Sequence, residues 1–105
     1  MEHLIDEFKN SMKVIQAMSL YDFQHQKFLF ADKALPEVSF LVAMAEELCF
    51  EDCEFLYFEG EQHHFFVRIR KDKEVLAILL IDQNKSYNKI ILEHKCAEFL
   101  EKVTG

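Results

Sequence analysis

The side chains with the clearest capacity for chemistry are three cysteines and two adjacent histidines. His63 and His64 lie in a segment with the alternation of a β-strand, where neighbours point to opposite faces, so they cannot both bind one metal ion. Cys49 and Cys53 are four apart, and the chain has no C-x-x-C or H-x-x-x-H pattern. We therefore expect no metal site and cysteines that act as small core residues. A Cys–His nucleophile pair stays open, because such partners meet only in the fold.

The two arginines, Arg68 and Arg70, raise the question of phosphate chemistry. They are two residues apart on one face of a predicted strand. An arginine finger is one interpretation, and a solvated strand face is the one we favour. Gly60 is the only glycine inside the chain, so there is no glycine-rich phosphate loop. The acidic EGE and FED segments lie in predicted turns and receive no acid–base role. The sequence predicts no enzyme and no cofactor.

Length and composition limit the possible classes of protein. The chain has 105 residues, enough for one domain over residues 1–105 and too few for two. Half of the residues are hydrophobic and 11 are Phe, so a substantial core is available and global disorder is not expected. The formal net charge of −7 argues against binding to nucleic acid or an anionic membrane, since phosphate contacts need a basic surface.

Two features bear on location. The first ten residues mix acidic and isolated apolar side chains, where a secretory signal needs a basic region followed by an apolar run. The longest apolar run, VLAILLI at residues 75–81, is too short to cross a bilayer. We expect no membrane insertion and a reducing cytoplasmic setting.

Hydrophobic periodicity predicts three helices and five strands. In chain order we expect a helix carrying residues 4–12, strands over 13–21 and 26–32, a helix over 35–50, strands over 54–61, 63–72 and 74–84, and a helix from about residue 87. Pro36 suits the first turn of the helix over 35–50. On the last helix the apolar residues form a single stripe: Leu92, Cys96, Phe99 and Val103, with Leu100 beside them. Residues 13–21 also fit a longer first helix, and the strand is the interpretation we favour. In the second strand, Phe28 and Phe30 should share one face and Leu29 should take the other.

The last two strands define the predicted layers. In the fourth, Phe65, Val67 and Ile69 alternate with Phe66, Arg68 and Arg70, which indicates one buried and one wetter face. The fifth is apolar at every position from residue 75 to 81, so it should be central and covered on both faces. The fold predicted is α+β, a five-stranded antiparallel sheet with helices on both faces, in the order α-β-β-α-β-β-β-α.

The helix predicted over residues 35–50 carries apolar residues on two sides. At about 100° per residue, one stripe is broad enough to cover a sheet face; it comprises Val38, Leu41, Val42, Ala45, Leu48 and Cys49. Roughly opposite lie Phe40, Ala43, Met44 and Glu47, with the spacing of a second contact surface. Scattered exposed apolar residues would also explain them. We favour a dimer interface, because the small Ala43 lets a second helix approach closely, and two-fold symmetry would pair this helix with its copy.

The order of elements resembles the roadblock (dynein light chain) family. The likeness covers nearly the whole chain and is best over CEFLYFEGEQHHFFVRIRKDKEVLAILLIDQNKSYNKIILEHKCAEFLEKV, while FLFAD…LPEVSFLVAMAEEL is similar to the family's second strand and central helix. One departure concerns the turn between the first two strands, where family members usually carry a glycine and this chain has YDFQHQK. The resemblance implies a roadblock/profilin-like fold over residues 1–105.

The resemblance also implies partners and a function. Central helices would pack together in a homodimer or in a heterodimer with a related roadblock subunit. The strand at about Glu54–Glu59 would pair edge to edge across that dimer through Phe55 and Tyr57. Family members act mainly as scaffolds or regulators of Ras-like small GTPases and dynein-like motors. We therefore expect a non-enzymatic, cytoplasmic scaffold or regulator that binds a Ras-like small GTPase or a motor complex.

One alternative function comes from a different class of protein. Profilin-like or PAS-like sensor domains also wrap helices around a five-stranded antiparallel sheet, and they bind a small ligand in a cavity between sheet and helix. The many Phe residues could line such a cavity or fill it. A tight core favours the scaffold, and a ligand-sized cavity favours the sensor.

Overall fold

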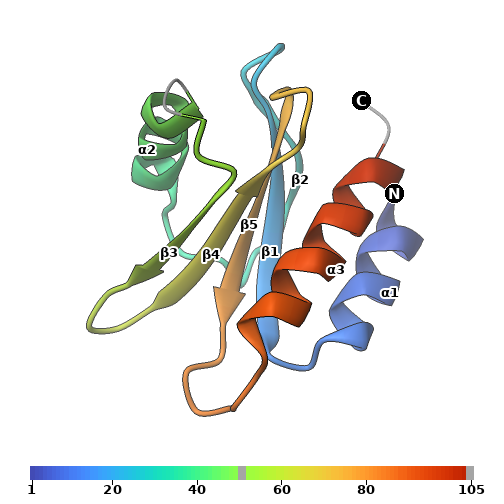
Figure 1. Cartoon of the computed structure of the whole chain (residues 1–105), viewed down its shortest axis with the longest axis vertical. Helices are drawn as coiled ribbons and strands as arrows, with labels where there is room; N and C mark the ends of the chain where they lie inside the picture. Colours follow the sequence, from blue (N-terminus) through green and yellow to red (C-terminus); the bar gives the residue numbers. More distant parts are fainter. Residues whose placement is uncertain (50–51, 104–105) are drawn as a thin grey trace.

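The computed structural model describes residues 1–49 and 52–103, with the side chains of residues 48 and 49 excepted. Three helices and five strands follow one another in the predicted order (Figure 1). They are α1 (Glu2–Ser11), β1 (Ile15–Asp22), β2 (Lys27–Ala31), α2 (Ser39–Cys49), β3 (Phe55–Glu59), β4 (His64–Ile69), β5 (Val75–Ile81) and α3 (Lys89–Lys102). The α+β fold is confirmed. The strand interpretation of residues 13–21 is confirmed from Ile15 onward, and residues 13 and 14 form a turn before the strand.

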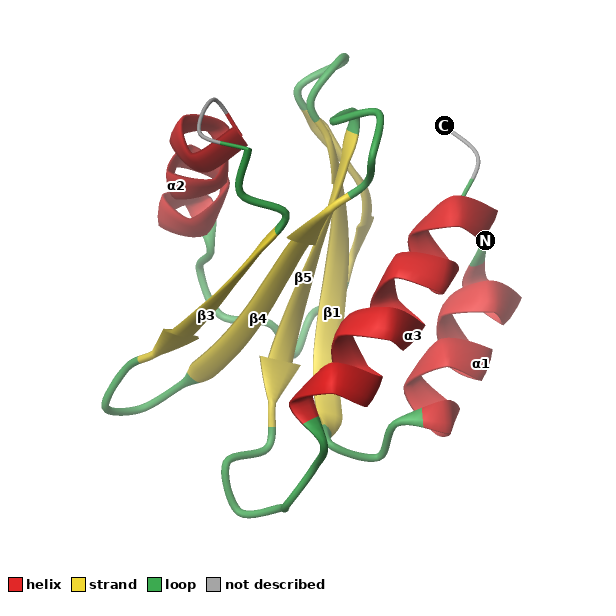
Figure 2. Cartoon of the chain, viewed as in Figure 1, coloured by secondary structure: helices red, strands yellow, loops and turns green. Residues whose placement is uncertain are grey.

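The strands form one antiparallel sheet in the order β2-β1-β5-β4-β3. Strand β5 is therefore central, and β2 and β3 are the outer strands. Helix α2 lies over one face, and α1 and α3 lie side by side over the other (Figure 2). None of the helices in the described part of the chain is long and apolar enough to span a bilayer.

The centre of the fold is β5, which is buried along its whole length. Ile78 belongs to the cluster under α2 and Leu79 to the cluster under α1 and α3, and both are 0% exposed. This confirms that the strand is covered on both faces. Successive side chains of a strand point to opposite faces. Because both faces are covered here, shortening any side chain of β5 removes core contacts, whichever face it points to.

Helices α1 and α3 close one face through their apolar stripes. Phe8 of α1 stacks on Phe99 of α3 with ring centroids 4.5 Å apart. The side chain of Asn88 accepts a hydrogen bond from the backbone N–H of Ile91 (3.1 Å) and so caps the start of α3. The predicted stripe on α3 is confirmed; its buried residues are Leu92, Cys96, Phe99, Leu100 and, just after the helix, Val103.

The side-chain pattern predicted for β2 is wrong. The register pairs Leu20 with Phe30 but Tyr21 with Phe28, so Leu29 is an extra residue in a β-bulge. Leu29 and Phe30 both pack on the α1 and α3 side, whereas Phe28 contacts Tyr21, which packs on the α2 side (ring centroids 5.1 Å apart). The bulge breaks the period of two on which the prediction relied.

The turn between β1 and β2 is organised by a buried carboxylate. Asp22 is 2% exposed and accepts hydrogen bonds from the backbone N–H groups of Gln24 (2.9 Å) and His25 (3.3 Å). Its other oxygen lies 2.6 Å from Nδ1 of His25, and this bond is the main cause that lowers the pKa of Asp22. Gln26 adopts φ 52°, a left-handed conformation that a glycine adopts more readily. These bonds hold the turn without a glycine.

Helix α2 begins later than predicted, at Ser39 rather than near residue 35. The carbonyl of Val38 accepts the first helical bond, from the N–H of Leu41 (2.9 Å). The carboxylate of Glu37 accepts hydrogen bonds from both the backbone N–H and the hydroxyl of Ser39. Pro36 therefore lies before the helix and not in its first turn. The predicted end at Phe50 falls outside the described residues.

Shortening Leu79 tests the central position of β5. Leu79→Ala should lower the free energy of unfolding by roughly 2–5 kcal/mol, through lost burial and the cavity that remains. Ile90, which is 65% exposed on α3, supplies the control. Ile90→Ala should change stability by no more than about 0.5 kcal/mol. Urea unfolding followed by circular dichroism measures both, and similar small losses in the two variants would contradict the two-sided packing of β5.

Candidate functional site

Helix α2 packs on the sheet through one stripe and exposes another. Val38, Leu41 and Ala45 are 6%, 0% and 5% exposed against the sheet. On the predicted outer side, Ala43 and Glu47 are exposed and Met44 is half-buried. Val42, a further member of the predicted core stripe, is half-buried and packs against the same cluster. The side chains of residues 48 and 49, its last two members, lie outside the described part of the chain. The outer side of α2 thus presents a small residue beside larger ones.

The helical projection predicted that Phe40 points away from the sheet, and the structure shows instead that it contacts the sheet. Its ring lies 5.4 Å from that of Phe58 on β3 and 6.4 Å from that of Phe65 on β4, measured between centroids. It is nevertheless 42% exposed. Phe40 therefore connects the outer side of α2 to β3 and forms one continuous apolar surface with it.

Strand β3 forms an outer edge of the sheet with free backbone groups. The N–H of Ile69 donates to the carbonyl of Glu54 (3.0 Å) at one end, and the N–H of Gly60 donates to the carbonyl of His63 (3.0 Å) at the other. Bonding alternates along an antiparallel pair, so every second residue of β3 turns its N–H and C=O away from β4. These outward residues are Phe55, Tyr57 and Glu59, which include both residues predicted for edge pairing.

The two outer strands differ in how open they are to pairing. Strand β2 carries the bulge at Leu29 and begins with Lys27, and both features hinder the addition of another strand. Strand β3 pairs with β4 in an unbroken register from Phe55 to Glu59, and its only charged residue is the last. Of the two edges, β3 is the one suited to pairing with another chain.

On the face of the sheet that α3 covers, contacts with α3 hold the side chains of Tyr57 and Glu59 of β3. The hydroxyl of Tyr57 donates to the carboxylate of Glu93 (2.8 Å), and burial, followed by this bond, raises the pKa of Tyr57. Lys89 lies 4.6 Å above the Tyr57 ring and 3.3 Å from the carboxylate of Glu59. The hydrophobic pattern of the sequence did not predict this network. The available signal was the spacing of Lys89 and Glu93, four apart on one side of a helix.

The arginines lie on a covered face of β4, so the interpretation of a solvated strand face is wrong. The side chains of Arg68 and Arg70 are 14% and 12% exposed, and Phe66 on the same face is 0% exposed. Arg70 is held by internal partners: Nε lies 3.0 and 2.9 Å from the oxygens of Asp72, and a terminal nitrogen donates to the carbonyl of Val103 (2.6 Å). Helix α3 therefore covers two arginine side chains that the alternation of residues along β4, taken alone, predicted to be exposed.

Among the described side chains, the cysteines and histidines are not gathered into one site, and the side chain of residue 49 lies outside that part of the chain. Cys96 is buried beneath α3, and burial raises its pKa to about 12. Cys53 is half-buried, and its thiol lies 3.0 Å from the carbonyl oxygen of Phe55. His63 is exposed and His64 half-buried. Within residues 1–49 and 52–103, no three His, Cys, Asp or Glu side chains are grouped so as to hold a metal ion.

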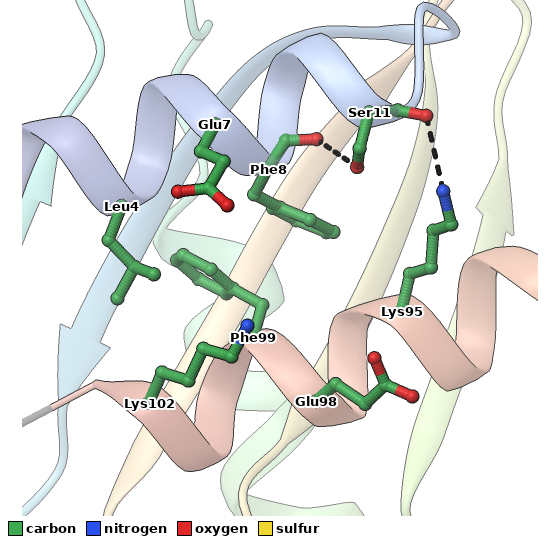
Figure 3. A pocket seen from close by; sticks show the side chains of 8 residues that line it. All are labelled: Leu4, Glu7, Phe8, Ser11, Lys95, Glu98, Phe99 and Lys102. Carbon is green, nitrogen blue, oxygen red and sulfur yellow. Dashed lines mark hydrogen bonds between the residues drawn. The ribbon is translucent and has the colours of Figure 1, made fainter.

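A groove of about 200 Å³ runs between α1 and α3 (Figure 3). Its floor is the stacked pair Phe8 and Phe99, which are only 6% and 3% exposed. At one end, Lys95 donates to the carbonyl of Ser11 (3.4 Å) and bridges the helices. The groove is therefore a seam between two packed helices with a polar rim, and it offers little apolar surface to a ligand.

Comparison with known proteins yields no relative of this chain. No model of a protein family matches it, and no curated protein and no solved structure matches it either. The assignment of function therefore depends on the α2 and β3 surface, on its neighbouring charges and on the resemblance in the sequence.

The cysteine environments generate a test of thiol chemistry. With a pKa near 12 and no exposed surface, Cys96 should stay unmodified when the folded protein meets a thiol reagent at about pH 8, because the thiolate is the reactive form. Cys53, which is only half-buried, should react faster. Mass spectrometry of peptides, with urea-unfolded protein as the fully reactive control, measures both. Preferential labelling of Cys96 in the folded protein would contradict its burial and revive a nucleophile role.

Proposed function

We propose that this chain is a non-enzymatic, dimeric interaction module that acts as a scaffold or regulator of a Ras-like small GTPase or a motor complex. The observation that carries the proposal is the unbulged edge of β3 next to the exposed apolar side of α2. This is the pair of elements through which a roadblock-like dimer would form. The partner in the dimer is a second copy or a related subunit.

The outward backbone groups of β3 define how two copies would pair. Those groups belong to residues 55, 57 and 59, and a two-fold axis requires a symmetric antiparallel register. Centring the axis on Tyr57 pairs it with the Tyr57 of the other copy and pairs Phe55 of each copy with Glu59 of the other. Every outward N–H and C=O of these residues then has a partner. A shift by one residue would leave those groups unmatched.

The same register would bring apolar side chains together on the α2 side of the sheet. Leu56 and Phe58 point to that side and are half-buried, and Phe40 leans on Phe58. Across the axis, Leu56 of one copy would lie opposite Phe58 of the other, and the two α2 helices would approach along Ala43. Edge pairing and helix packing thus support one continuous interface, for which we expect about 1,600 Å² or more of total buried area.

The space beneath α2 favours the interaction module over a ligand sensor. The gap between α2, the start of β3 and the neighbouring strands amounts to about 20 Å³. Pockets for small organic ligands usually measure about 300–1,000 Å³. A hollow of about 310 Å³ does lie between β2 and residues 35–39, but it is widely open to solvent and is not enclosed between helix and sheet. Phe65, Leu76 and Ile78 fill the face of the sheet under the helix. The aromatic residues therefore occupy the place where a profilin-like or PAS-like sensor would hold its ligand.

Paired substitutions test the dimer. Ala43→Glu should dissociate it by placing two carboxylates between the α2 helices, and Ala34→Glu, at an exposed loop position, is the matched control. Glu59→Pro should weaken it because proline removes an outward N–H but no bond to β4. Glu59→Ala removes the same carboxylate and keeps the N–H, so it should stay dimeric. Sedimentation equilibrium measures all four, and a monomeric parent protein or unaffected variants would contradict the proposed interface.

Nucleotide assays test the non-enzymatic role. The purified chain should neither bind nor hydrolyse GTP, since it has no phosphate loop and Arg70 is committed to internal partners. Fluorescence of a labelled GTP analogue and phosphate release measure this, with a Ras-like GTPase as the positive control. Any effect on turnover should require an added cognate GTPase. Stoichiometric binding of GTP by the chain alone would contradict the scaffold proposal.

A further inference from the structure

The two arginines of β4 are partnered very differently. Arg70 has carboxylate and carbonyl partners along its whole guanidinium group. Arg68 is nearly as buried, yet among the described residues the one carboxylate that reaches it is Glu54, through a single nitrogen at 3.5 Å. The side chain of Glu54 is 69% exposed, so this contact is weak and easily displaced. Arg68 thus has N–H groups that could still donate to an acceptor, and its guanidinium group is partly shielded from water.

The guanidinium group of Arg68 is held flat and in place. It lies over the ring of Phe55, 5.4 Å from the centroid, in a cation–π contact. An arginine fixed in this way presents a planar fork of N–H groups whose geometry matches the two oxygens of a carboxylate. Glu54 uses only one point of that fork. A free carboxylate could use two.

Arg68 opens into a cleft of about 340 Å³ between β4, α3 and the turn after β4. Ala97 and Leu100 of α3 contribute apolar surface, and Lys71 and Lys73 add positive charge. Lys73, with φ 63°, lies 3.7 Å from Asp52, with φ 59°, so two residues in the left-handed conformation meet at one side. The cleft lies on the α3 side of the sheet, opposite α2.

The charges of the cleft restrict the anion that fits. Asp52, Glu54 and Glu101 line it together with the cations, so a doubly charged phosphate would meet repulsion from three carboxylates. A monoanion would meet less. Its carbon chain could contact the apolar wall of Ala97 and Leu100 while its oxygens face Arg68. The fork geometry, the apolar wall and the acidic rim together favour one class of ligand.

We propose that this cleft binds a short-chain organic monocarboxylate, whose two oxygens engage the fork of Arg68 and displace Glu54. The ligand could be a free metabolite or the carboxylate of a partner's peptide chain, since both offer the same group. This binding function is separate from the α2 and β3 interface, so each can fail without the other.

Butyrate is a suitable probe, titrated into the full chain at constant ionic strength and followed by NMR of backbone amides. We expect saturable shifts at the residues around the cleft with a dissociation constant of about 1 mM, as for two charge-assisted hydrogen bonds to a partly buried arginine. Arg68→Lys keeps the charge but loses the fork and should weaken binding about tenfold. Inorganic phosphate should bind more weakly than butyrate, and tighter binding of phosphate would overturn the proposed ligand class.

Glu54→Gln gives a test in the opposite direction, and its exposed position keeps the fold intact. Removing the competing carboxylate should tighten butyrate binding by about two- to fivefold. Glu101→Gln removes the same charge from the cleft without touching Arg68 and should change the affinity less. An acetylated peptide with a free C-terminus, compared with its amide, tests the partner-derived source. No saturable shift with butyrate or with the peptide, or equal effects of the two Glu variants, would overturn the proposal.

Discussion

The whole structure depends on a strand that must be covered on both sides. All 7 residues of β5 are apolar and buried, so the chain has to place helices over each face of the sheet. It places two over one face and one over the other. A single helix is too narrow to cover a face of five strands, which leaves aromatic side chains of the α2 side partly exposed. These are Tyr21, Phe23, Phe28, Phe40 and Phe58.

The uneven covering of the sheet links the fold to its proposed role. On the side with two helices, Phe8 and Phe99 close the seam between α1 and α3, and little apolar surface remains for a partner. On the side with one helix, Phe40 joins the outer side of α2 to β3, the strand whose edge is free of a bulge. The surface left incomplete by the single helix therefore coincides with the edge that can accept another strand. One partner could satisfy both.

Much of the fold follows from the local pattern of hydrophobic residues. Where the structure differs from the prediction, the cause is a contact between elements, which a local pattern does not contain. The uniform apolarity of residues 75–81 located the central strand, and the period of Leu92, Cys96 and Phe99 located the last helix. The bulge at Leu29 was not predictable because register depends on the neighbouring strand.

The burial of Arg68 and Arg70 was missed for a related reason. Alternation indicates which residues share a face, but which face is covered depends on where α3 packs. The outer side of α2 shows the same limit. The helical projection placed Ala43, Met44 and Phe40 on that side, but the contact of Phe40 with Phe58 depends on where the sheet lies beneath the helix.

The two helical layers also differ in how firmly they are attached. Polar contacts fix the side with α1 and α3: Tyr57 bonds to Glu93, Arg70 to the carbonyl of Val103, and Lys9 of α1 to Asp32 (3.2 Å). Within residues 1–49 and 52–103, the contacts of α2 with the sheet are apolar. Apolar contacts are not directional, so a helix held by them can shift without breaking a hydrogen bond. The layer next to the free strand edge is thus the one that can adjust to a partner, while the opposite layer keeps the sheet in shape.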